Sequence, residues 1–329
     1  LCQGPERKRF RVGGIEVHWL PGIDELPATI RDLRPRRLFV QQDWAPRAAE
    51  IARAVGLPYW YFIRSTEELV EDDGGATGAD ELAAAARSAA ALAGSRARAT
   101  ADLVAGAERV VANSRFMASA IATAYGREAQ VLYPEVDPPL PWETRRNGMS
   151  RCILAVATTN KKGVGIVLEL AKAFPEETFL LCGFKELTPF LQSRIDKKVI
   201  RNMVPVGQLP TPATYALAKL VLVPSQWAEP FGRVNAEAAL RGIPVFASRV
   251  GGIPEVIADD ALLVTDFRDP AAWAERLRGL LLPGALRATR PTMTRAAAAY
   301  GALLRANEAL LARIVHKLCE RSGTENVIP

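Results

Sequence analysis

One segment of this 329-residue chain, residues 221–255, constrains the fold more than any other. It has the sequence VLVPSQWAEPFGRVNAEAALRGIPVFASRVGGIPE. The apolar residues 220–224 predict a buried strand of a parallel sheet, and residues 225–230 form the loop at its carboxyl end. The next helix is expected to start near Phe231 or Gly232, because a proline restricts the residue before it and a glycine lets the backbone approach a ligand. Ligands of open α/β sheets bind at this end of the strands, so the segment predicts a binding site.

Two glutamates with seven residues between them, Glu229 and Glu237, lie in this segment. Glu229 falls in the loop, and Glu237 is expected about two turns into the helix. Carboxylates placed in this way can accept charge-assisted hydrogen bonds from different hydroxyls of one elongated ligand, such as a sugar joined to a ribose. Each glutamate alone is better explained by structure, Glu237 as a solvated helix residue and Glu229 as a helix-start carboxylate favoured by the macrodipole.

The segment as a whole resembles the E-x7-E signature of retaining glycosyltransferases of the two-lobed GT-B type, the broad family 4 group also called glycosyl transferases group 1. The shared pattern comprises W-x-EPFG, the second glutamate, A-x-x-x-G-x-PV at 238–245 and S-x-x-GG-x-PE at 248–255. A match of this length is far more specific than a short glycine motif. It implies the α/β GT-B fold, in which two Rossmann-like, doubly wound parallel-sheet domains face a cleft.

The resemblance also implies roles for individual residues. Glu229 is implied to hold hydroxyls of the donor sugar and to stabilise the developing oxocarbenium ion, and Glu237 to bind the ribose hydroxyls of the nucleotide. The remaining donor contacts come from loop residues, several of them glycines whose backbone can approach a ligand closely. These are Pro230, Phe231 and Gly232 at the sugar, and Gly207, Gly251 and Gly252 at the nucleotide.

A basic turn earlier in the chain agrees with this interpretation. Residues 152–156 predict a strand and residues 164–173 an amphipathic helix, with TTNKKG at 158–163 between them. Free amides at a helix start attract phosphate, and an adjacent lysine adds a full charge. By resemblance, Lys162 and Gly163 grip the donor diphosphate, and Lys162 acts in catalysis. A solvated basic turn is the alternative interpretation.

The chain departs from the family pattern beside this lysine. An arginine is usual five residues before it, and that position is Ala157 here. One phosphate contact is therefore missing. Arg233, in the first turn after EPFG, or Lys161 is expected to supply the charge instead.

A second departure concerns the acceptor side. Relatives often place a histidine near the reacting sugar after the strand expected at 58–64, and this chain has Arg64 there. Arg64 and Glu67 are candidate acceptor-side residues, for the leaving phosphate and the acceptor respectively. A surface turn with a helix-start S-T-x-E pattern is the favoured interpretation of residues 65–68.

Length and pattern predict two domains. We expect an acceptor-binding Rossmann-like domain at 1–141, a donor-binding Rossmann-like domain at 142–291, and a C-terminal helical region at 292–329 that crosses back toward the first domain. The proline- and charge-rich residues 134–147 are the expected linker. The first domain is expected to be truncated, because the chain starts in what resembles a second strand. In the family a βαβ unit, which takes about 30 residues, includes an earlier strand and helix.

Apolar runs alternate with helical patterns in both halves, which predicts parallel sheets covered on both faces. A single long helix is expected over the alanine-rich residues 79–105, and Ser114 is expected to cap a helix that starts at Arg115. Strands are expected at 14–20, 38–42, 58–64, 109–112 and 130–133 in the first half, and at 152–156, 178–182, 204–206, 220–223, 244–247 and 261–264 in the second.

The net charge of +6 is compatible with nucleic acid, an anionic membrane or an anionic substrate as partner. Basic residues cluster at 7–11 and 31–37 without interleaved aromatic residues, which favours a solvated surface over nucleic-acid binding. No apolar run approaches the roughly 20 residues of a membrane span, so a cytoplasmic protein, peripheral to the membrane at most, is expected. Four widely spaced cysteines and two isolated histidines predict neither a metal site nor a disulfide framework.

These features predict a retaining hexosyltransferase that uses a UDP- or GDP-linked sugar as donor and needs no metal or other cofactor. The acceptor is expected to be a carbohydrate, a lipid or a small molecule. The resemblance implies front-face attack, in which the leaving diphosphate helps to deprotonate the acceptor. One alternative is a non-catalytic or degraded homologue that binds nucleotide sugars. A third candidate, a nucleic-acid-binding protein, would show steeply salt-dependent binding.

Overall fold

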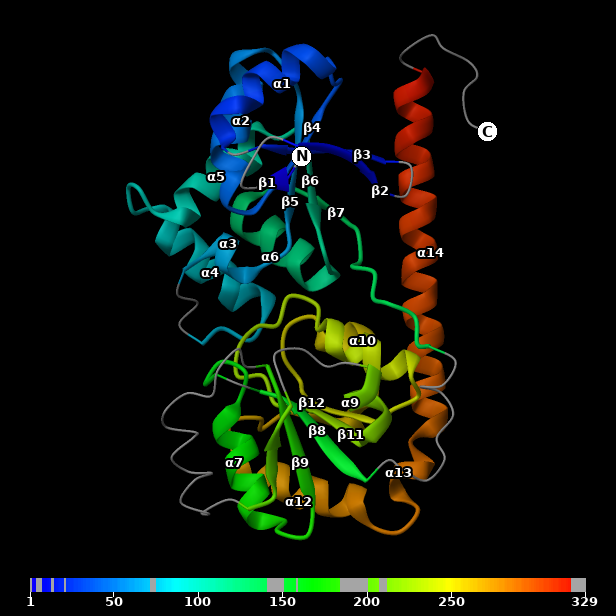
Figure 1. Cartoon of the computed structure of the whole chain (residues 1–329). Coiled ribbons are helices and arrows are strands. Elements are labelled where there is room, and N and C mark those ends of the chain that lie inside the picture. The colour runs from blue at the N-terminus through cyan, green and yellow to red at the C-terminus, as the bar shows by residue number, and fades with distance from the viewer. Residues whose placement is uncertain are drawn as a thin grey trace. The chain divides into compact units, whose positions relative to one another are not determined.

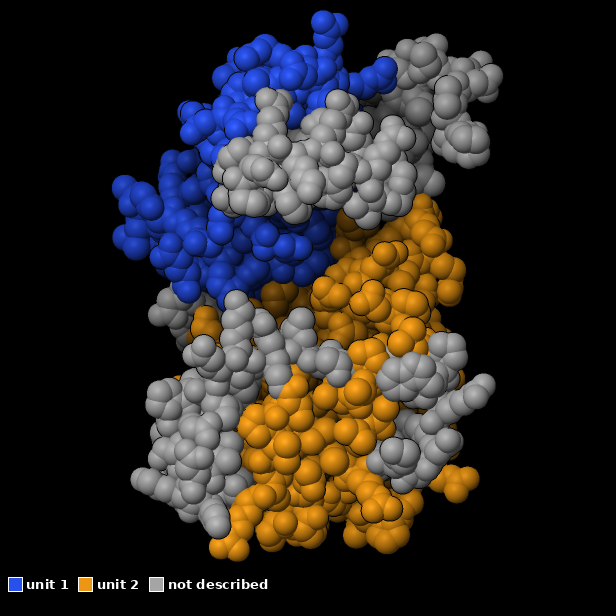
Figure 2. All heavy atoms as spheres, viewed as in Figure 1, with its two compact units in different colours: residues 1–74, 79–113, 117–131 blue, residues 75–78, 114–116, 132–329 orange. Residues whose placement is uncertain are grey.

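The computed structural model describes residues 2–3, 8–12, 15–20, 22–71, 75–140, 151–157, 159–183, 201–206 and 212–320 (Figure 1). For residues 2–19 and 311–320 it describes the backbone alone. The chain divides into two compact units (Figure 2). The first unit comprises residues 1–74, 79–113 and 117–131, and the second comprises residues 75–78, 114–116 and 132–329.

A four-stranded parallel sheet forms the centre of the first unit, with the order β4-β5-β6-β7. Its middle strand β5 is the apolar run YWYFI, in which Tyr59, Tyr61 and Ile63 are almost fully buried. Strands with such runs fit a sheet that is covered on both faces. All four strands lie within two residues of their predicted positions, at β4 Leu38–Gln41, β5 Tyr59–Ile63, β6 Arg109–Ala112 and β7 Ala129–Val131.

The helices of the first unit connect these strands in the expected alternation. Two short 3-10 turns, η1 Ile23–Glu25 and η2 Gln42–Trp44, lead into the first two helices. The helices are α1 Leu26–Leu33, α2 Ala45–Ala54, α3 Thr66–Leu69, α4 Ala79–Ala90, α5 Arg96–Gly106 and α6 Arg115–Tyr125. The first two residues of α6 belong to the second unit.

The prediction of one helix over residues 79–105 is wrong, since α4 and α5 are separate helices. The chain between them contains Gly94, whose φ of +76° is a conformation that alanine rarely adopts. Ser95 then caps α5, with its side chain accepting a hydrogen bond from the backbone N–H of Arg98 at 3.1 Å. A glycine and a serine thus interrupt a stretch in which alanine otherwise favours helix.

The strand predicted at 14–20 exists but does not join the four-stranded sheet. β3 Ile15–Leu20 pairs antiparallel with β2 Lys8–Val12 and parallel with β1 Cys2–Gln3, in a separate sheet of order β1-β3-β2. The hairpin was missed although the two glycines at 13 and 14 between strand-like runs favour one. Because basic residues dominate 7–11, this segment was interpreted as a solvated surface and not as a strand.

The second unit contains a six-stranded parallel sheet with the order β10-β9-β8-β11-β12-β13. From β8 the chain moves outward through β9 to β10, and from β11 it moves outward the other way, so the winding direction reverses between the neighbours β8 and β11. In a doubly wound sheet, ligands bind at such a reversal, outside the carboxyl ends of the strands. The strands are β8 Cys152–Val156, β9 Thr178–Cys182, β10 Met203–Pro205, β11 Ala218–Val223, β12 Val245–Ser248 and β13 Leu263–Val264.

These strands lie within two residues of the predictions, except that β13 is shorter. Part of the range predicted for it forms the 3-10 turn η3 Asp260–Leu262, where Asp259 accepts a hydrogen bond from the amide of Ala261. In the core beside the sheet, the rings of Phe246 and Trp273 meet edge to face at 4.8 Å. The helices are α7 Val164–Ala173, α9 Pro212–Leu217, α10 Arg233–Leu240, α11 Ile253–Val256, α12 Pro270–Leu281, α13 Ala285–Ala288 and α14 Arg290–Glu320.

The long helix α14 packs against α10 and α11 and holds the segment that follows β7. Asn307 accepts a hydrogen bond from the backbone N–H of Tyr133 at 2.9 Å and donates one to its carbonyl at 2.7 Å. Tyr300 donates to the carbonyl of Pro134 at 2.7 Å and accepts from the amide of Val136 at 3.0 Å. None of the helices in the described part of the chain has the length and apolar character that a bilayer crossing requires.

Candidate functional site

Two side chains meet where the sheet of the second unit reverses direction. Lys162 lies in the turn after β8, and Glu229 lies in the loop after β11. The Lys162 Nζ is 2.9 Å from Oε1 and 2.7 Å from Oε2 of Glu229. The glutamate side chain is 15% exposed and the lysine side chain 35%, so the pair is partly screened by water. The two residues that the sequence marked as catalytic therefore lie in contact.

Glu229 is held by two further donors from its own loop. Ser225 donates its hydroxyl to Oε2 at 3.1 Å, and the indole N–H of Trp227 donates to the same oxygen at 3.0 Å. The Trp227 ring also faces the two lysines, with Nζ of Lys162 at 4.9 Å and Nζ of Lys161 at 5.6 Å from its centroid. Sequence reasoning assigned no role to Ser225 or Trp227. Their position four and two residues before a loop glutamate was the available signal.

Gly163 is required by the way the basic turn packs. Its φ is +79°, and a Cβ at this position would lie 1.9 Å from the carbonyl oxygen of Pro224. The turn is also tied to the neighbouring loop, because the backbone N–H of Gln226 donates to the carbonyl of Lys161 at 2.7 Å. As the N-cap of α7, Gly163 brings no side chain that could occupy the first amides of the helix. The turn therefore has the form of an anion-binding helix start.

Gly251 and Gly252 pack directly on the backbone of the Glu229 loop. A Cβ on Gly251 would lie 2.2 Å from the carbonyl oxygen of Glu229, and one on Gly252 would lie 2.5 Å from that of Pro230. The amide of Gly252 donates to the Glu229 carbonyl at 2.8 Å. The absence of side chains here thus lets two loops touch. Gly232 has a φ of +86° and precedes the first residue of α10, close to the predicted helix start.

Glu237 lies one turn into α10, so its predicted place two turns in is wrong. It accepts a hydrogen bond from the hydroxyl of Tyr215 in α9 at 2.7 Å, and its side chain is 20% exposed. Burial, together with the Glu237 charge, raises the pKa of the Tyr215 hydroxyl well above its usual range. The Arg241 guanidinium covers the Tyr215 ring at 4.7 Å. Sequence reasoning missed Tyr215, since its contact depends on how α9 docks.

The two candidates for the missing phosphate charge have different surroundings. Arg233 is 59% exposed and its guanidinium lies 3.9 Å from Glu237. Lys161 is exposed and lies over Trp227, beside Lys162. Ala157, at the position where the family pattern led us to expect arginine, is fully buried. Gly207 lies outside the described residues.

In the first unit the predicted S-T-x-E helix start is confirmed. Ser65 accepts a hydrogen bond from the amide of Glu67, and Glu68 accepts one from the amide of Ser65, as in a capping box. The Glu67 carboxylate in turn accepts a hydrogen bond from the Ser65 hydroxyl. Arg64 has an exposed side chain, and its amide donates to Glu68 at 3.0 Å.

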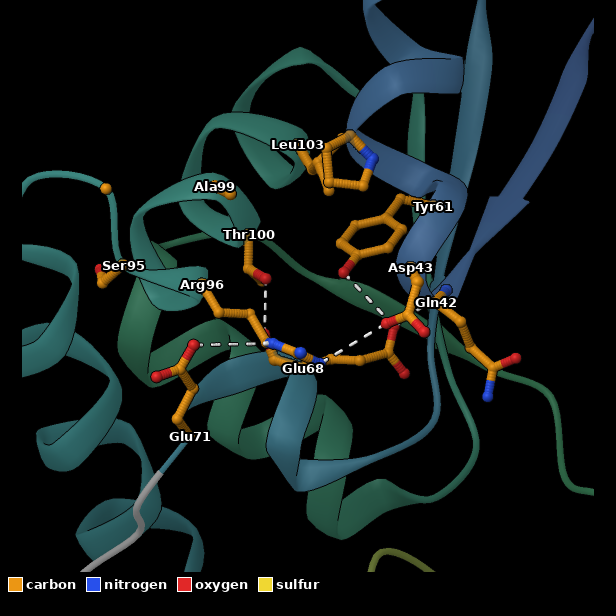
Figure 3. A pocket seen from close by; sticks show the side chains of 12 residues that line it. Gln42, Asp43, Tyr61, Glu68, Glu71, Ser95, Arg96, Ala99, Thr100 and Leu103 are labelled. Carbon is orange, nitrogen blue, oxygen red and sulfur yellow. Dashed lines mark hydrogen bonds and ion pairs between the residues drawn. The ribbon is translucent and has the colours of Figure 1, made fainter. Parts of the chain in front are cut away.

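Glu68 also borders a cavity of about 450 Å³ in the first unit, which sequence reasoning missed (Figure 3). Burial raises the pKa of this carboxyl above its usual range, against the opposing effect of its backbone donors. Tyr61 donates to Glu68 at 3.4 Å, and the Arg96 guanidinium lies 3.7 Å from Asp43 and 3.9 Å from Glu71 at the same cavity. These residues come from β5, α3, the segment just after α3, η2 and α5, so they are separated in the sequence.

The larger part of the second unit matches a known protein family. Residues 138–296 match the family Glycosyl transferases group 1. The chain is 29% identical over 225 residues to D-inositol 3-phosphate glycosyltransferase of Xylanimonas cellulosilytica, an alignment that covers 60% of this chain and 54% of that protein. It is 39% identical over 72 residues to spore coat protein SA of Bacillus subtilis, which covers 21% of this chain and 19% of that protein. The chain thus spans about half, or less, of the length of these relatives.

Solved structures share the fold over almost the whole chain. Anabaena Alr3699/HepE in complex with UDP and glucose superposes with a TM-score of 0.67 and 18% identity, covering 90% of this chain and 83% of that chain. The pneumococcal O-GlcNAc transferase GtfA in complex with UDP and GlcNAc gives a TM-score of 0.64 and 14% identity, covering 94% and 63% of the respective chains. At sequence identities of 14% and 18%, the similarity shows a shared fold and nothing more specific. The chain has the α/β fold of GT-B glycosyltransferases, with two parallel-sheet domains, and its residues 138–296 match the Glycosyl transferases group 1 family.

Proposed function

We propose that the protein is a retaining glycosyltransferase that moves a hexose from a UDP- or GDP-linked sugar to a hydroxyl of a carbohydrate, lipid or small-molecule acceptor. The observation that carries the proposal is the Lys162–Glu229 pair at the reversal point of a doubly wound sheet. A cation and a carboxylate side by side suit a ligand in which a diphosphate is joined to a sugar. The bound UDP and sugars of Alr3699/HepE and GtfA support a donor of this class.

Lys162 would neutralise the leaving diphosphate. Its ammonium group has three N–H donors, so it can keep Glu229 as a partner and donate to a phosphate oxygen as well. The amides at the start of α7 add partial positive charge from the same direction. Preorganised charge of this kind stabilises a leaving group without reorganisation during the reaction.

Glu229 would act on the sugar. Its carboxylate is fixed by Lys162, Ser225 and Trp227, so its orientation costs little entropy when a donor binds. It can accept sugar hydroxyls and stabilise positive charge at the ring as the bond to phosphate breaks. The acceptor oxygen would form its bond to the anomeric carbon on the face that the diphosphate leaves, and the acceptor proton would pass to a phosphate oxygen. No carboxylate then serves as a nucleophile, unlike in retaining glycosidases.

Glu237 would bind the nucleoside. Its carboxylate lies on α10, eight positions after Glu229, and Tyr215 occupies only one of its hydrogen-bonding positions. A ribose diol can donate to the remaining ones. Arg233 beside it, or Lys161, would contact the phosphate that arginine contacts in relatives. Since these groups supply the charge, we propose that no metal ion is needed.

The proposal is tested by turnover with defined donors. UDP-glucose and GDP-mannose are incubated with the protein in excess EDTA, and released UDP or GDP is measured against Glu229→Gln and Lys162→Met. Donor-dependent release of one nucleotide diphosphate, lost in both variants, is expected. The product of donor hydrolysis or transfer should first form with the donor's anomeric configuration, seen by NMR. Inverted product, or turnover that EDTA abolishes, would contradict the mechanism.

A further inference from the structure

Glu255, the last residue of the S-x-x-GG-x-PE pattern, is surrounded by donors in the second unit and is only partly exposed. Its side chain is 11% exposed. Oε1 accepts a hydrogen bond from the amide of Phe116 at 2.7 Å, and Oε2 accepts one from the amide of Arg115 at 3.0 Å. The hydroxyl of Tyr133 donates to Oε2 at 3.1 Å, and the Arg115 guanidinium lies 3.5 Å from the same oxygen. Three hydrogen bonds and one ion pair thus converge on one carboxylate.

Two of these partners, Tyr133 and Arg115, lie next to the residues that follow Glu229, Tyr133 by direct contact and Arg115 through its neighbour Ser114. The ring of Tyr133 lies 5.8 Å from that of Phe231, which is almost fully buried. Ser114, the neighbour of Arg115, donates its hydroxyl to the carbonyl of Pro230 at 2.6 Å. Ser114 therefore binds the Pro230 carbonyl and Tyr133 packs on the Phe231 ring, while Glu255 binds Tyr133 and the amide of Arg115, next to Ser114. The Pro230–Phe231 peptide directly continues the loop that carries the Glu229 side chain.

A helix cap alone would not require this arrangement. A serine, threonine or aspartate at the position before the helix is the common way to satisfy first-turn amides. Ser114 stands at that position in this chain, yet the amides of Arg115 and Phe116 donate to a carboxylate about 140 positions later, which also binds the tyrosine that packs on the loop. The acceptor is charged, which makes each of its hydrogen bonds stronger than a neutral one. One carboxylate thus sets the positions of two segments that touch the same peptide.

We propose that Glu255 is a positioning residue, which fixes the Pro230–Phe231 peptide through Tyr133 and Ser114 and thereby sets the site for the sugar part of the donor. The inference rests on the proposed function. It concerns the sugar and not the nucleotide, because the described contacts of the Glu237 carboxylate, which are with Tyr215 and Arg233, do not involve Glu255. A change at Glu255 should therefore alter sugar recognition and leave nucleotide recognition in place.

The test compares affinities for UDP and UDP-glucose, and for GDP and GDP-mannose, by calorimetry in wild type and Glu255→Gln. Glutamine keeps the shape but turns an NH₂ group toward N–H donors, so it cannot hold all the partners. The nucleotide Kd is expected to stay within about twofold, while the ratio of the sugar-nucleotide Kd to the nucleotide Kd rises about tenfold or more. Asp259→Asn is the matched control. Asp259 also accepts one amide, from Ala261 at 2.9 Å, and one hydroxyl, from Thr292 at 2.7 Å, neither of which contacts the loop.

Hydrogen exchange of the same variants measures directly how well the loop amides are protected from solvent. Amides of residues 228–235 are expected to exchange faster in Glu255→Gln than in wild type, and those of β8 at an unchanged rate. An unchanged affinity ratio together with unchanged exchange would overturn the inference and leave the proposed function standing. Failure of wild type to bind any nucleotide would remove the proposed function and the inference with it. If Glu255→Gln does not fold, Tyr133→Phe and Ser114→Ala each remove one branch and should move the ratio in the same direction.

Discussion

Three glycines of the second unit offer a graded test of how the basic turn is built. Gly163 combines a φ of +79° with a Cβ position 1.9 Å from the Pro224 carbonyl oxygen. Gly284 has a φ of +83° with nothing within 4 Å of its Cβ position. Gly165, in α7, has nothing within 4 Å of its Cβ position and no positive φ. Alanine substitutions at these three sites therefore distinguish three contributions to the free energy of unfolding. These are steric overlap, backbone strain and helix propensity.

The expected costs follow from these environments. Gly165→Ala should stabilise the unit by about 0.5–1 kcal/mol, because alanine is the better helix residue. Gly284→Ala should destabilise it by about 1–2 kcal/mol, the cost of a left-handed alanine. Gly163→Ala carries the same strain and an overlap with a backbone atom, for which overpacking adds about 1–3 kcal/mol. Its total is about 2–5 kcal/mol.

Urea unfolding followed by circular dichroism measures these differences in stability. Titration with UDP measures the nucleotide affinity of each variant. Gly163→Ala should also weaken nucleotide binding about tenfold or more, because relief of the overlap moves the Lys162 turn away from the loop after β11. Gly165→Ala and Gly284→Ala should bind as wild type does. A Gly163→Ala stability equal to that of Gly284→Ala, with normal UDP affinity, would refute the packing argument.

Three further outcomes are expected. Lys162→Met should lower UDP affinity about tenfold or more in calorimetry and leave the fold intact by circular dichroism, since the side chain is partly exposed. Loss of UDP affinity in Arg233→Ala but not in Lys161→Ala would assign the missing phosphate contact to Arg233, and the reverse result would assign it to Lys161. The hydrogen bond from Arg37 lowers the pKa of Glu108. The carboxylate therefore stabilises the fold above about pH 4, and Glu108→Gln should unfold at lower urea than wild type at pH 7, a difference that disappears as the pH falls below that range.

The sequence predicted the second unit better than the first for a physical reason. Its strands are continuous apolar runs such as TFLLC in β9, buried on both faces, and each is bounded by glycine, proline or a polar turn. The family resemblance implied that Lys162 and Glu229 lie in one site, and both follow predicted parallel strands. The pattern did not show that the strands β8 and β11, which are far apart in the sequence, are neighbours in the sheet.

The errors came from contacts that local pattern does not encode. Alanine content favoured one helix over 79–105, and the conformation of Gly94 divides it. β3 pairs with β2, whose basic residues had favoured a solvated surface over a strand. Tyr215 contacts Glu237, and Glu255 contacts the amides of Arg115 and Phe116. Both contacts depend on how segments that are distant in the sequence pack together. Glu255 ends the S-x-x-GG-x-PE pattern, but that pattern does not show which residues the carboxylate contacts.

The central claim is that Glu237 binds the nucleotide of a sugar donor. Its direct test is calorimetric titration of UDP, GDP and ADP, and of their glucose or mannose conjugates, into wild type, Glu237→Ala and the control Glu275→Ala, which changes an exposed glutamate of α12. Saturable binding of one nucleotide is expected in wild type and the control. It should fall by about tenfold or more in Glu237→Ala, because hydrogen bonds to a charged group are worth about 1.5–3 kcal/mol. A folded wild-type protein that binds none of these ligands, or a Glu237→Ala variant that binds equally well, would contradict the account.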